Sequence, residues 1–434
     1  MGCVYGAANE EAAQTIKTAI HHAETQSRRA NTAPTLAPSF GLGNLDFEAA
    51  FTYSTALGNV LEMDDLARTA ILHAGPVIIP AALYSALQCG SNYHQLLNAI
   101  VRGYEAAIRL GNSLDAYHYQ RWHPTSTAGV AGAAVAAAAI YQMNTTQQLT
   151  ALCNALSVSG GLWHTRHGNS MTKQWHSVHT ARTGVSAVHS ALYGFTAAEQ
   201  IIEGEQGWHQ VLADSPSPEN IVNTDDWAIR QTSFKPWPAC RHCHAAIDAA
   251  LKINAELKNK AELKISDRLT KSQIKTIEAV SVDTYNDAQI FCDRVSPTTA
   301  AEARFSLQHS IAVALIKGTV LPADFEIDTI RDVELQTLRS KTIVTSCPQM
   351  TQNYPAHFGS TVTLTLNNGE TLKETITDAM GDPEWPLSEQ QIRNKFDMLC
   401  DWGIGDHSKT QHLADSVLDA PEHTEVAALV KSAP

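Results

Sequence analysis

The chain has 434 residues, 44% hydrophobic and 17% charged, a globular balance that leaves room for one to three domains. Its 31 basic and 44 acidic residues give a net charge of −13. Nonspecific binding to nucleic acid is therefore not expected, because phosphates require a positive surface. Nineteen histidines, whose charge changes near neutral pH, are a large share for such a chain. An anionic substrate would need local clusters of cationic side chains.

The N-terminal segment and the cysteines carry no sign of export. The opening MGCVYGAANEEAAQTIK lacks a basic region followed by an apolar core, so we expect no secretory signal. The eight cysteines are scattered along the chain, which favours a reducing compartment. The longest apolar run, over 128–141, is shorter than the ~20 residues that a membrane span needs. The sequence thus predicts a cytoplasmic protein that does not bind membranes.

Helical periodicity dominates from residue 9 to about 254, as in the segments 47–63 and 94–114. The Ala-rich run over 128–141 predicts a helix packed closely against its neighbours. A Lys-rich stretch over 252–275 then separates this part of the chain from one with a different pattern. The first part is therefore expected to form a helical domain.

Strand-like runs follow at 274–285 and 361–377, and Asn368-Gly369 predicts a hairpin turn within the second of them, because both residues tolerate positive φ. Further helices are expected at about 299–317 and 388–399. The predicted fold is mainly α with α+β. Its parts are a helical domain over 1–262, a smaller α+β domain over 263–399 and a C-terminal segment over 400–434 that packs back on the helical domain.

Two charged clusters lie in the helical part. In LEMDDLARTAILHAGP (61–76), Asp64 and its neighbouring acids precede Arg68 and His73, and acids in an apolar segment are costly to bury unless they are paired. In HYQRWHPTSTAG (118–129), Arg121 and His123 precede a helix, and the positive end of a helix keeps a nearby His neutral. The alternatives are a helix end with solvated carboxylates and a structural histidine.

Two further clusters are basic. In GNSMTKQWHSVHTARTG (168–184), Lys173 and His176 lie three residues apart, a spacing that places them on one face of a helix. This cluster indicates a small carboxylate ligand or, alternatively, a solvated basic face. FKPWPACRHCHAAIDAAL (234–251) contains Lys235 and the pattern Cys240-x-x-Cys243-His244, which fits haem attachment or zinc only weakly. A helix is expected from His244 onward.

Six segments in this order resemble the MmgE/PrpD family, which includes 2-methylcitrate dehydratases, cis-aconitate decarboxylases and iminodisuccinate epimerases. The resemblance spans nearly the whole chain. The segments are Asp64-Asp65…His73, GYEAAIRLG (103–111), WHPTSTAGVAGAA (122–134), SMTKQWH…ARTGVSA (170–187), FTAAEQIIEGEQGW (195–208) and KPWPACRHCHAAID (235–248).

This resemblance implies a large helical domain and a smaller α+β domain, with the active site in the cleft between them, and a homodimer. It also implies chemistry without a metal or organic cofactor, so the Cys-x-x-Cys-His pattern becomes incidental. The first helix of the family is expected to be missing from this chain. Active-site positions of the family fall on Asp64, His73, His123, Lys173, Lys235 and Cys240. Candidates for binding the substrate are Arg68, Arg121, His176, Arg241 and His244.

Two departures from the family pattern bear on the substrate. The first motif commonly reads Asp-Asp-Thr-His, whereas this chain has Asp64-Asp65-Leu66-Ala67-Arg68. A hydroxyl that contacts substrate is thus missing, and Arg68 is expected to replace it. Cys240 stands where some decarboxylases have His, which places decarboxylation third among the expected reactions.

The reactions of the family make or quench a carbanion beside a carboxylate, which requires a positioned base and cations that stabilise the enediolate. His123 and Asp64 are the candidate proton-transfer pair, with His73 or Cys240 delivering a proton to the opposite face. The sequence predicts a cofactor-independent lyase of a small di- or tricarboxylate, most like 2-methylcitrate dehydratase. An epimerase or isomerase comes next, then a decarboxylase, and an inactive binding or scaffold protein is the alternative from another class. Lys173→Ala and Lys235→Ala are each expected to abolish turnover with little loss of folding.

Overall fold

The computed structural model describes residues 1–28, 47–167, 170–222, 226–260, 268–405 and 407–431. The contacts within the chain divide it into two compact units. Unit 1 comprises Met1–Val60, Asp64–Thr232 and Ser388–Pro434, and unit 2 comprises Leu61–Met63 and Ser233–Leu387. The sequence had placed this boundary at residue 262. The contacts instead assign 233–262 to unit 2 and the helix that begins after Ser388 to unit 1.

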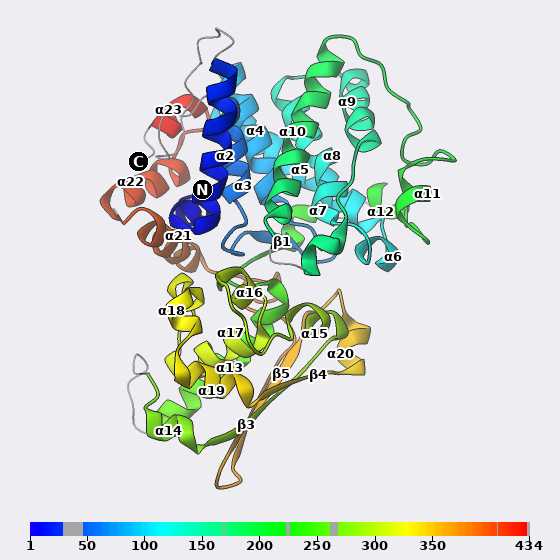
Figure 1. Ribbon diagram of the computed structural model, residues 1–434. Helices are drawn as coiled ribbons and strands as arrows, with labels where there is room; N and C mark the ends of the chain where they lie inside the picture. The colour runs from blue at the N-terminus through cyan, green and yellow to red at the C-terminus, as the bar shows by residue number, and fades with distance from the viewer. Residues whose placement is uncertain (29–46, 168–169, 223–225, 261–267, 406, 432–434) are drawn as a thin grey trace. The chain divides into compact units, whose positions relative to one another are not determined.

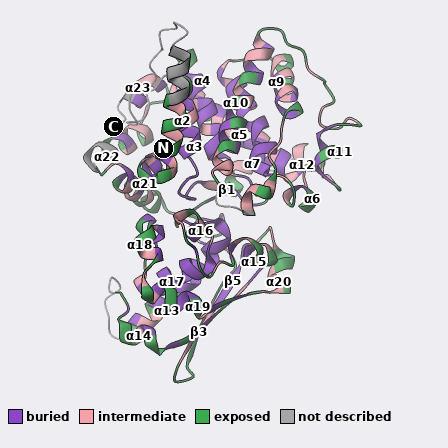
Figure 2. Cartoon of the chain, viewed as in Figure 1, coloured by how far each residue is buried: buried purple, intermediate pink, exposed green. Residues whose placement is uncertain are grey.

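Unit 1 is helical, as predicted, and the Ala-rich segment lies at its centre. This segment forms α8 (Gly129–Ile140), in which all but two residues are buried; buried residues are purple in Figure 2, which has the same view as Figure 1. Small residues allow this close packing: a Cβ on Gly132 would lie 2.7 Å from the carbonyl oxygen of Gly103 on the neighbouring helix α5 (Tyr93–Asn112). The long helices around α8 thus position the loops that carry the site.

Other elements of unit 1 surround this core (Figure 1). Along the chain they are α1 (Gly2–Gly6), η1 (Ala7–Asn9), α2 (Glu11–Arg28), α3 (Phe47–Leu57), β1 (Asp65–Ala67), α4 (Gly75–Cys89), α6 (Ala116–Tyr119), α7 (Pro124–Thr127), α9 (Thr145–Ser157), η2 (Trp163–His167), α10 (Thr172–Leu192), α11 (Trp208–Leu212), α12 (Glu219–Val222), η3 (Ala228–Gln231), α21 (Glu389–Gly403), α22 (His407–Leu418) and α23 (Val426–Lys431).

Unit 2 is built on a four-stranded sheet of order β4-β3-β5-β6. The strands are β3 (Ile277–Thr284), β4 (Thr342–Ser346), β5 (Ser360–Leu366) and β6 (Thr371–Ile376), and only the β3–β4 pair is parallel, with Val280 opposite Thr342. The helices α13 (His244–Lys260) and α17 (Leu307–Lys317) pack against each other, and each also contacts the sheet. Their apolar residues and the buried strand residues share one core.

Shorter elements complete unit 2 (Figure 1). They are β2 (Thr232–Phe234), of which the last two residues belong to this unit, η4 (Arg241–Cys243), α14 (Lys271–Thr276), α15 (Asn286–Cys292), α16 (Ala300–Arg304), η5 (Pro322–Phe325), α18 (Ile327–Ile330), α19 (Val333–Ser340) and α20 (Pro348–Asn353).

Two local predictions need correction. The predicted hairpin is present, but only Gly369 has positive φ, at +82°, so the turn is not the two-residue type in which both central residues do. The amide of Gly369 donates to the carbonyl of Leu366, and a left-handed Gly after this turn gives a longer loop. The single helix expected at 299–317 is two helices, because the side chain of Ser306 caps a new helix by accepting from the amide of His309.

Candidate active site

A short loop of unit 1 brings an acid and a histidine of the first motif together. After β1 the chain turns back on itself, and Ala67 and Leu72 exchange two backbone hydrogen bonds. This turn places His73 Nδ1 2.6 Å from Asp64 Oδ2. Both side chains are largely buried, so the carboxylate orients the imidazole ring and stabilises positive charge on it. The sequence predicts that Asp64 and His123 form the proton-transfer pair and that His73 or Cys240 serves the opposite face, whereas the structure brings Asp64 and His73, residues of one motif, into direct contact.

The second acid of the motif has a structural role. Asp65 accepts hydrogen bonds from the backbone N–H of Gly75, at 3.1 and 3.2 Å, and from the hydroxyl of Tyr104, at 2.9 Å. Burial, followed by the charge of Asp64, raises the pKa of the Asp65 carboxyl, while the bond from Tyr104 acts in the opposite direction. Asp65 thus fixes the start of α4 and with it the far end of the loop that carries His73.

His123 lies where the sequence placed it, directly before the short helix α7. Its backbone N–H donates to Gly161, and the backbone N–H of Trp163 donates to Arg121. These two bonds hold the indole of Trp163 flat against the imidazole of His123, with ring centroids 4.3 Å apart and planes inclined by 6°. This stacking could not be predicted from the sequence, because Trp163 lies 40 residues further along the chain and belongs to no motif.

His123 and His176 share a hydrogen bond between their Nδ1 atoms, which are 3.2 Å apart. The other ring nitrogen of His123, Nε2, is buried and has no hydrogen-bond partner among the residues that the structure describes. Burial lowers the pKa of His123 well below its usual value, and the positive charges of Lys173, His176 and His73 add to this shift. The neutral ring therefore carries one lone pair and one N–H, which is what a general base requires.

Helix α10 supplies the two basic residues of the third motif. Lys173 and His176 lie one turn apart near its start, as the spacing predicted, with Lys173 half-buried and His176 buried. One turn further on, the hydroxyl of Thr180 lies 3.0 Å from that of Ser126 in α7, so the two helices are tied together. In unit 1, α7 and α10 thus group His123, His176 and Lys173. The loop 64–73 joins this group through the backbone N–H of His73, which donates to Thr125 in α7.

Two further predicted substrate-binding residues of unit 1 are Arg68 and Arg121. Arg68 is buried in the turn after β1. Arg121 is exposed, donates to the carbonyl of Tyr117 and stacks its guanidinium over the Tyr117 ring at 3.7 Å. Their roles toward substrate stay predictions.

In unit 2, Lys235 is fully buried and forms an ion pair with Glu62, with 3.2 Å between Nζ and Oε2. Glu62 is itself buried and has a φ of +53°, a backbone conformation that non-glycine residues rarely adopt and that often marks functional sites. In the sequence, Glu62 is only one of several acids in its segment. The signal that singles it out is the matching buried cation, 173 residues further along the chain.

The other predicted residues of unit 2 lie around the start of α13. Arg241 binds Asp382 and the carbonyls of Ala379 and Met380, and so holds the loop 379–382. His244 donates through Nε2 to the carbonyl of Ala239 and accepts through Nδ1 from Arg241. These bonds are structural, and a substrate role for either residue stays a prediction.

Cys240 is buried beside two other thiols. Burial raises the pKa of Cys292 well above its usual value, and the neighbouring Cys240 and Cys243 thiols raise it further. One group among the described residues has the geometry to bind a metal, namely His357, Asp378 and Glu384 on unit 2, and it contains none of the predicted site residues. In the described part of the chain, no helix is long and apolar enough to cross a membrane.

Comparison with known proteins agrees with this arrangement of motifs. Residues 1–221 match the model of the MmgE/PrpD N-terminal domain, and residues 237–420 match that of the C-terminal domain. The chain belongs to the MmgE/PrpD family. It is 26% identical to mouse cis-aconitate decarboxylase over 404 residues, which cover 88% of this chain and 79% of the relative. The human cis-aconitate decarboxylase is 25% identical over 360 residues, 80% of this chain and 71% of the relative.

A dehydratase is also among the relatives of this MmgE/PrpD protein. The probable 2-methylcitrate dehydratase of Saccharomyces cerevisiae is 24% identical over 216 residues, which cover 48% of this chain and 37% of the relative. Relatives named for two different reactions are thus similar to this chain.

Proposed function

We propose that this MmgE/PrpD protein is a lyase that removes a proton beside a carboxylate of a small di- or tricarboxylate, without a cofactor, as a 2-methylcitrate dehydratase does. The observation that carries the proposal is the pair of histidines held in opposite environments. His123 is neutral and has an unpartnered Nε2, whereas His73 lies against the carboxylate of Asp64. Environments that differ in this way separate a general base from a general acid.

The roles of the residues follow from these environments. When Nδ1–H of His123 donates to Nδ1 of His176, the lone pair of Nε2 is the base that takes the proton from carbon. The ammonium of Lys173 stabilises the enediolate that forms on the neighbouring carboxylate. His73, charged beside Asp64, gives its proton to the departing hydroxyl, which leaves as water. Lys235 is the second candidate cation for a substrate carboxylate, on the strength of its motif.

Decarboxylation is the second candidate, and the observation that favours it is the extent of the match to the two decarboxylases, which covers 80–88% of this chain. The same residues suffice for either reaction, because loss of carbon dioxide also leaves a carbanion beside a carboxylate that an acid must protonate. Cys240 stands where the family resemblance places His in some decarboxylases, so dehydration remains the first candidate reaction.

The test is incubation of the protein with 2-methylcitrate, citrate, cis-aconitate and a hydroxydicarboxylate, each in deuterated water and followed by NMR. A new double bond with loss of water supports dehydration, and loss of carbon dioxide supports decarboxylation. Deuterium uptake without net conversion supports an epimerase or isomerase. If none of the four compounds reacts or exchanges, the proposed function is refuted for this substrate class.

A further inference from the structure

Unit 2 contains a cavity of about 510 Å³ that none of the predicted site residues lines. The loop 295–298 forms one wall, and the helices α18 and α19 form the other. Its volume lies within the range of 300–1,000 Å³ that is usual for sites of small molecules. The cavity is lined by Val295, Ser296, Pro297, Thr298, Ile327, Ile330, Arg331, Gln336, Arg339 and Ser340.

The charged residues that line this cavity are all basic. The lining contains two arginines and no acidic residue, in a protein whose net charge is −13. Two nearby carboxylates are already bound elsewhere. Asp332 accepts from Arg268 and from backbone amides at the start of α19, and Glu302 accepts from the backbone N–H and the hydroxyl of Thr298. The residues that line the cavity carry no negative charge of their own.

Arg339 is a buried cation bound to neutral groups. Its side chain is 4% exposed, and its guanidinium donates to the carbonyl of Ile330 and to Nδ1 of His309. His309 is neutral, since Nδ1 accepts from Arg339, Nε2 donates to the carbonyl of Asp324, and burial lowers the pKa of the ring to about 4. In the described part of the chain, no carboxylate lies within ion-pair distance of Arg339, and its Nε–H is buried without an acceptor.

A buried charge without a counter-charge is costly, and proteins usually pair such groups. Here burial lowers the pKa of Arg339, against the opposing charge of Asp332. An anion in the adjacent cavity would supply the missing negative charge in surroundings where electrostatic interactions are stronger than in water.

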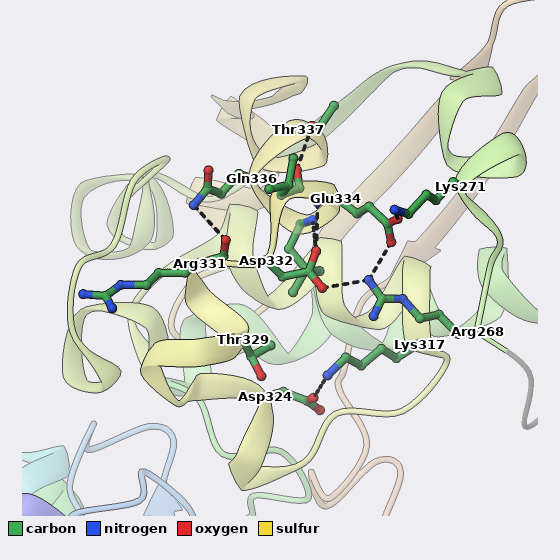
Figure 3. A network of polar contacts seen from close by, with 12 residues as sticks. Arg268, Lys271, Lys317, Asp324, Thr329, Arg331, Asp332, Glu334, Gln336 and Thr337 are labelled. Carbon is green, nitrogen blue, oxygen red and sulfur yellow. Dashed lines mark hydrogen bonds and ion pairs between the residues drawn. The ribbon is translucent and has the colours of Figure 1, made fainter.

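Arg331 is the second cation of the cavity, and it is exposed. Figure 3 shows its guanidinium directed away from Asp332 and Glu334, whose carboxylates face Arg268 and Lys271. No ion pair of Arg331 occurs among the residues that the structure describes. Its planar guanidinium is therefore available to bind a carboxylate in the bidentate way that Arg favours.

The apolar residues that line the cavity indicate the chemistry of the rest of the ligand. Val295, Pro297, Ile327 and Ile330 are apolar, so the cavity offers hydrocarbon contacts next to its two cations. We propose that this cavity binds a small organic carboxylate, with its carboxylate beside Arg331 and Arg339 and its apolar body against these side chains. This site would be separate from the residues that the proposed function uses.

Benzoate is a suitable probe, because it joins one carboxylate to an apolar body. Its dissociation constant would be measured by ligand-observed NMR at low salt, in parallel with inorganic phosphate. The main variant is Arg331→Gln, which changes an exposed residue and leaves the core intact. Lys271→Gln is the matched control, because it removes a positive charge from the surface of the same unit outside the cavity. Lys173→Ala removes a cation of the candidate active site.

The proposal predicts that wild type, Lys271→Gln and Lys173→Ala bind benzoate equally, and that Arg331→Gln binds it at least tenfold more weakly, a change of about 1.4 kcal/mol. Absence of benzoate binding in the wild type would overturn the proposal. So would equal binding by Arg331→Gln, or loss of binding in Lys173→Ala, which would place benzoate in the active site. Phosphate binding as tight as that of benzoate, with the same dependence on Arg331, would overturn the assignment to an organic carboxylate.

Discussion

Replacing Lys235 by methionine removes the cation from its buried ion pair with Glu62. The side chains of Lys235 and Glu62 are 0% and 5% exposed, and their charged atoms are 3.2 Å apart. An exposed pair would contribute about 0–1 kcal/mol, whereas breaking a buried pair costs about 3–5 kcal/mol because one charge stays buried. We therefore expect Lys235→Met to lower the free energy of unfolding by about 3–5 kcal/mol. This changes the expectation from sequence that substitution of Lys235 spares the fold.

The assay is equilibrium unfolding in urea, followed by circular dichroism and tryptophan fluorescence and fitted with separate transitions if the two units unfold independently. Glu62→Gln should also destabilise, and the double variant should lose less than the sum of the two single losses, because each single variant already breaks the same ion pair. Lys260→Met is the control, since Lys260 pairs with Glu256 and Glu370 at the surface of the same unit, and it should change the urea midpoint little. A loss below about 1 kcal/mol in Lys235→Met would refute the reasoning.

Three other predictions concern unit 1 and the buried histidines. Lys173→Ala should lower kcat at least about 100-fold. The urea midpoint should stay near that of wild type, because Lys173 is only half-buried. An unchanged kcat would show that Lys173 is not part of the active site. Gly132→Ala should destabilise unit 1 by about 1–3 kcal/mol in the same unfolding assay, since the new Cβ would lie 2.7 Å from a carbonyl oxygen of α5, whereas Gly160→Ala meets no atom within 4 Å and should be neutral. His118 and His309 have pKa values lowered to about 4 by burial. The unfolded chain takes up these protons near pH 6.5 and the folded chain near pH 4, so stability should fall as pH drops through this window, by up to about 3 kcal/mol for each histidine. Replacing either histidine with Gln should reduce the dependence of the free energy of unfolding on pH between pH 6.5 and pH 4. An unchanged dependence would contradict the argument that burial lowers these pKa values.

Local patterns in the sequence predicted the helices and the contacts within single motifs, because these depend on residues that are close together in the chain. Apolar residues at helical spacing predicted the helix α5, and the Ala-rich run predicted α8. The spacing of Lys173 and His176 predicted that both lie on one face of a helix, and they lie near the start of α10. Family motifs selected Asp64, His73 and His123. The Asp64–His73 contact was within reach of the sequence, because the two residues are nine apart in one motif.

Contacts between segments that are far apart in the chain could not be predicted from these patterns. Trp163 stacks on His123 because two backbone hydrogen bonds bring separate loops together, and no periodicity encodes that pairing. The ion pair of Glu62 and Lys235 likewise joins segments that are far apart in the chain. The break between α16 and α17 was missed because apolar residues on both sides continue a helical pattern, while the cap of Ser306 ends it. Arg339 lies in no motif, and its lack of a counter-charge is visible only when its surroundings are known.

The central claim is that Nε2 of His123 takes the proton from the carbon beside a substrate carboxylate. Its most direct test is the exchange of that hydrogen with deuterated water, measured by NMR on a substrate that the wild-type protein converts, in wild type and in His123→Asn. We expect that the variant still binds the substrate and exchanges the hydrogen at least about 100-fold more slowly. Exchange at the wild-type rate in His123→Asn would show that another group is the base.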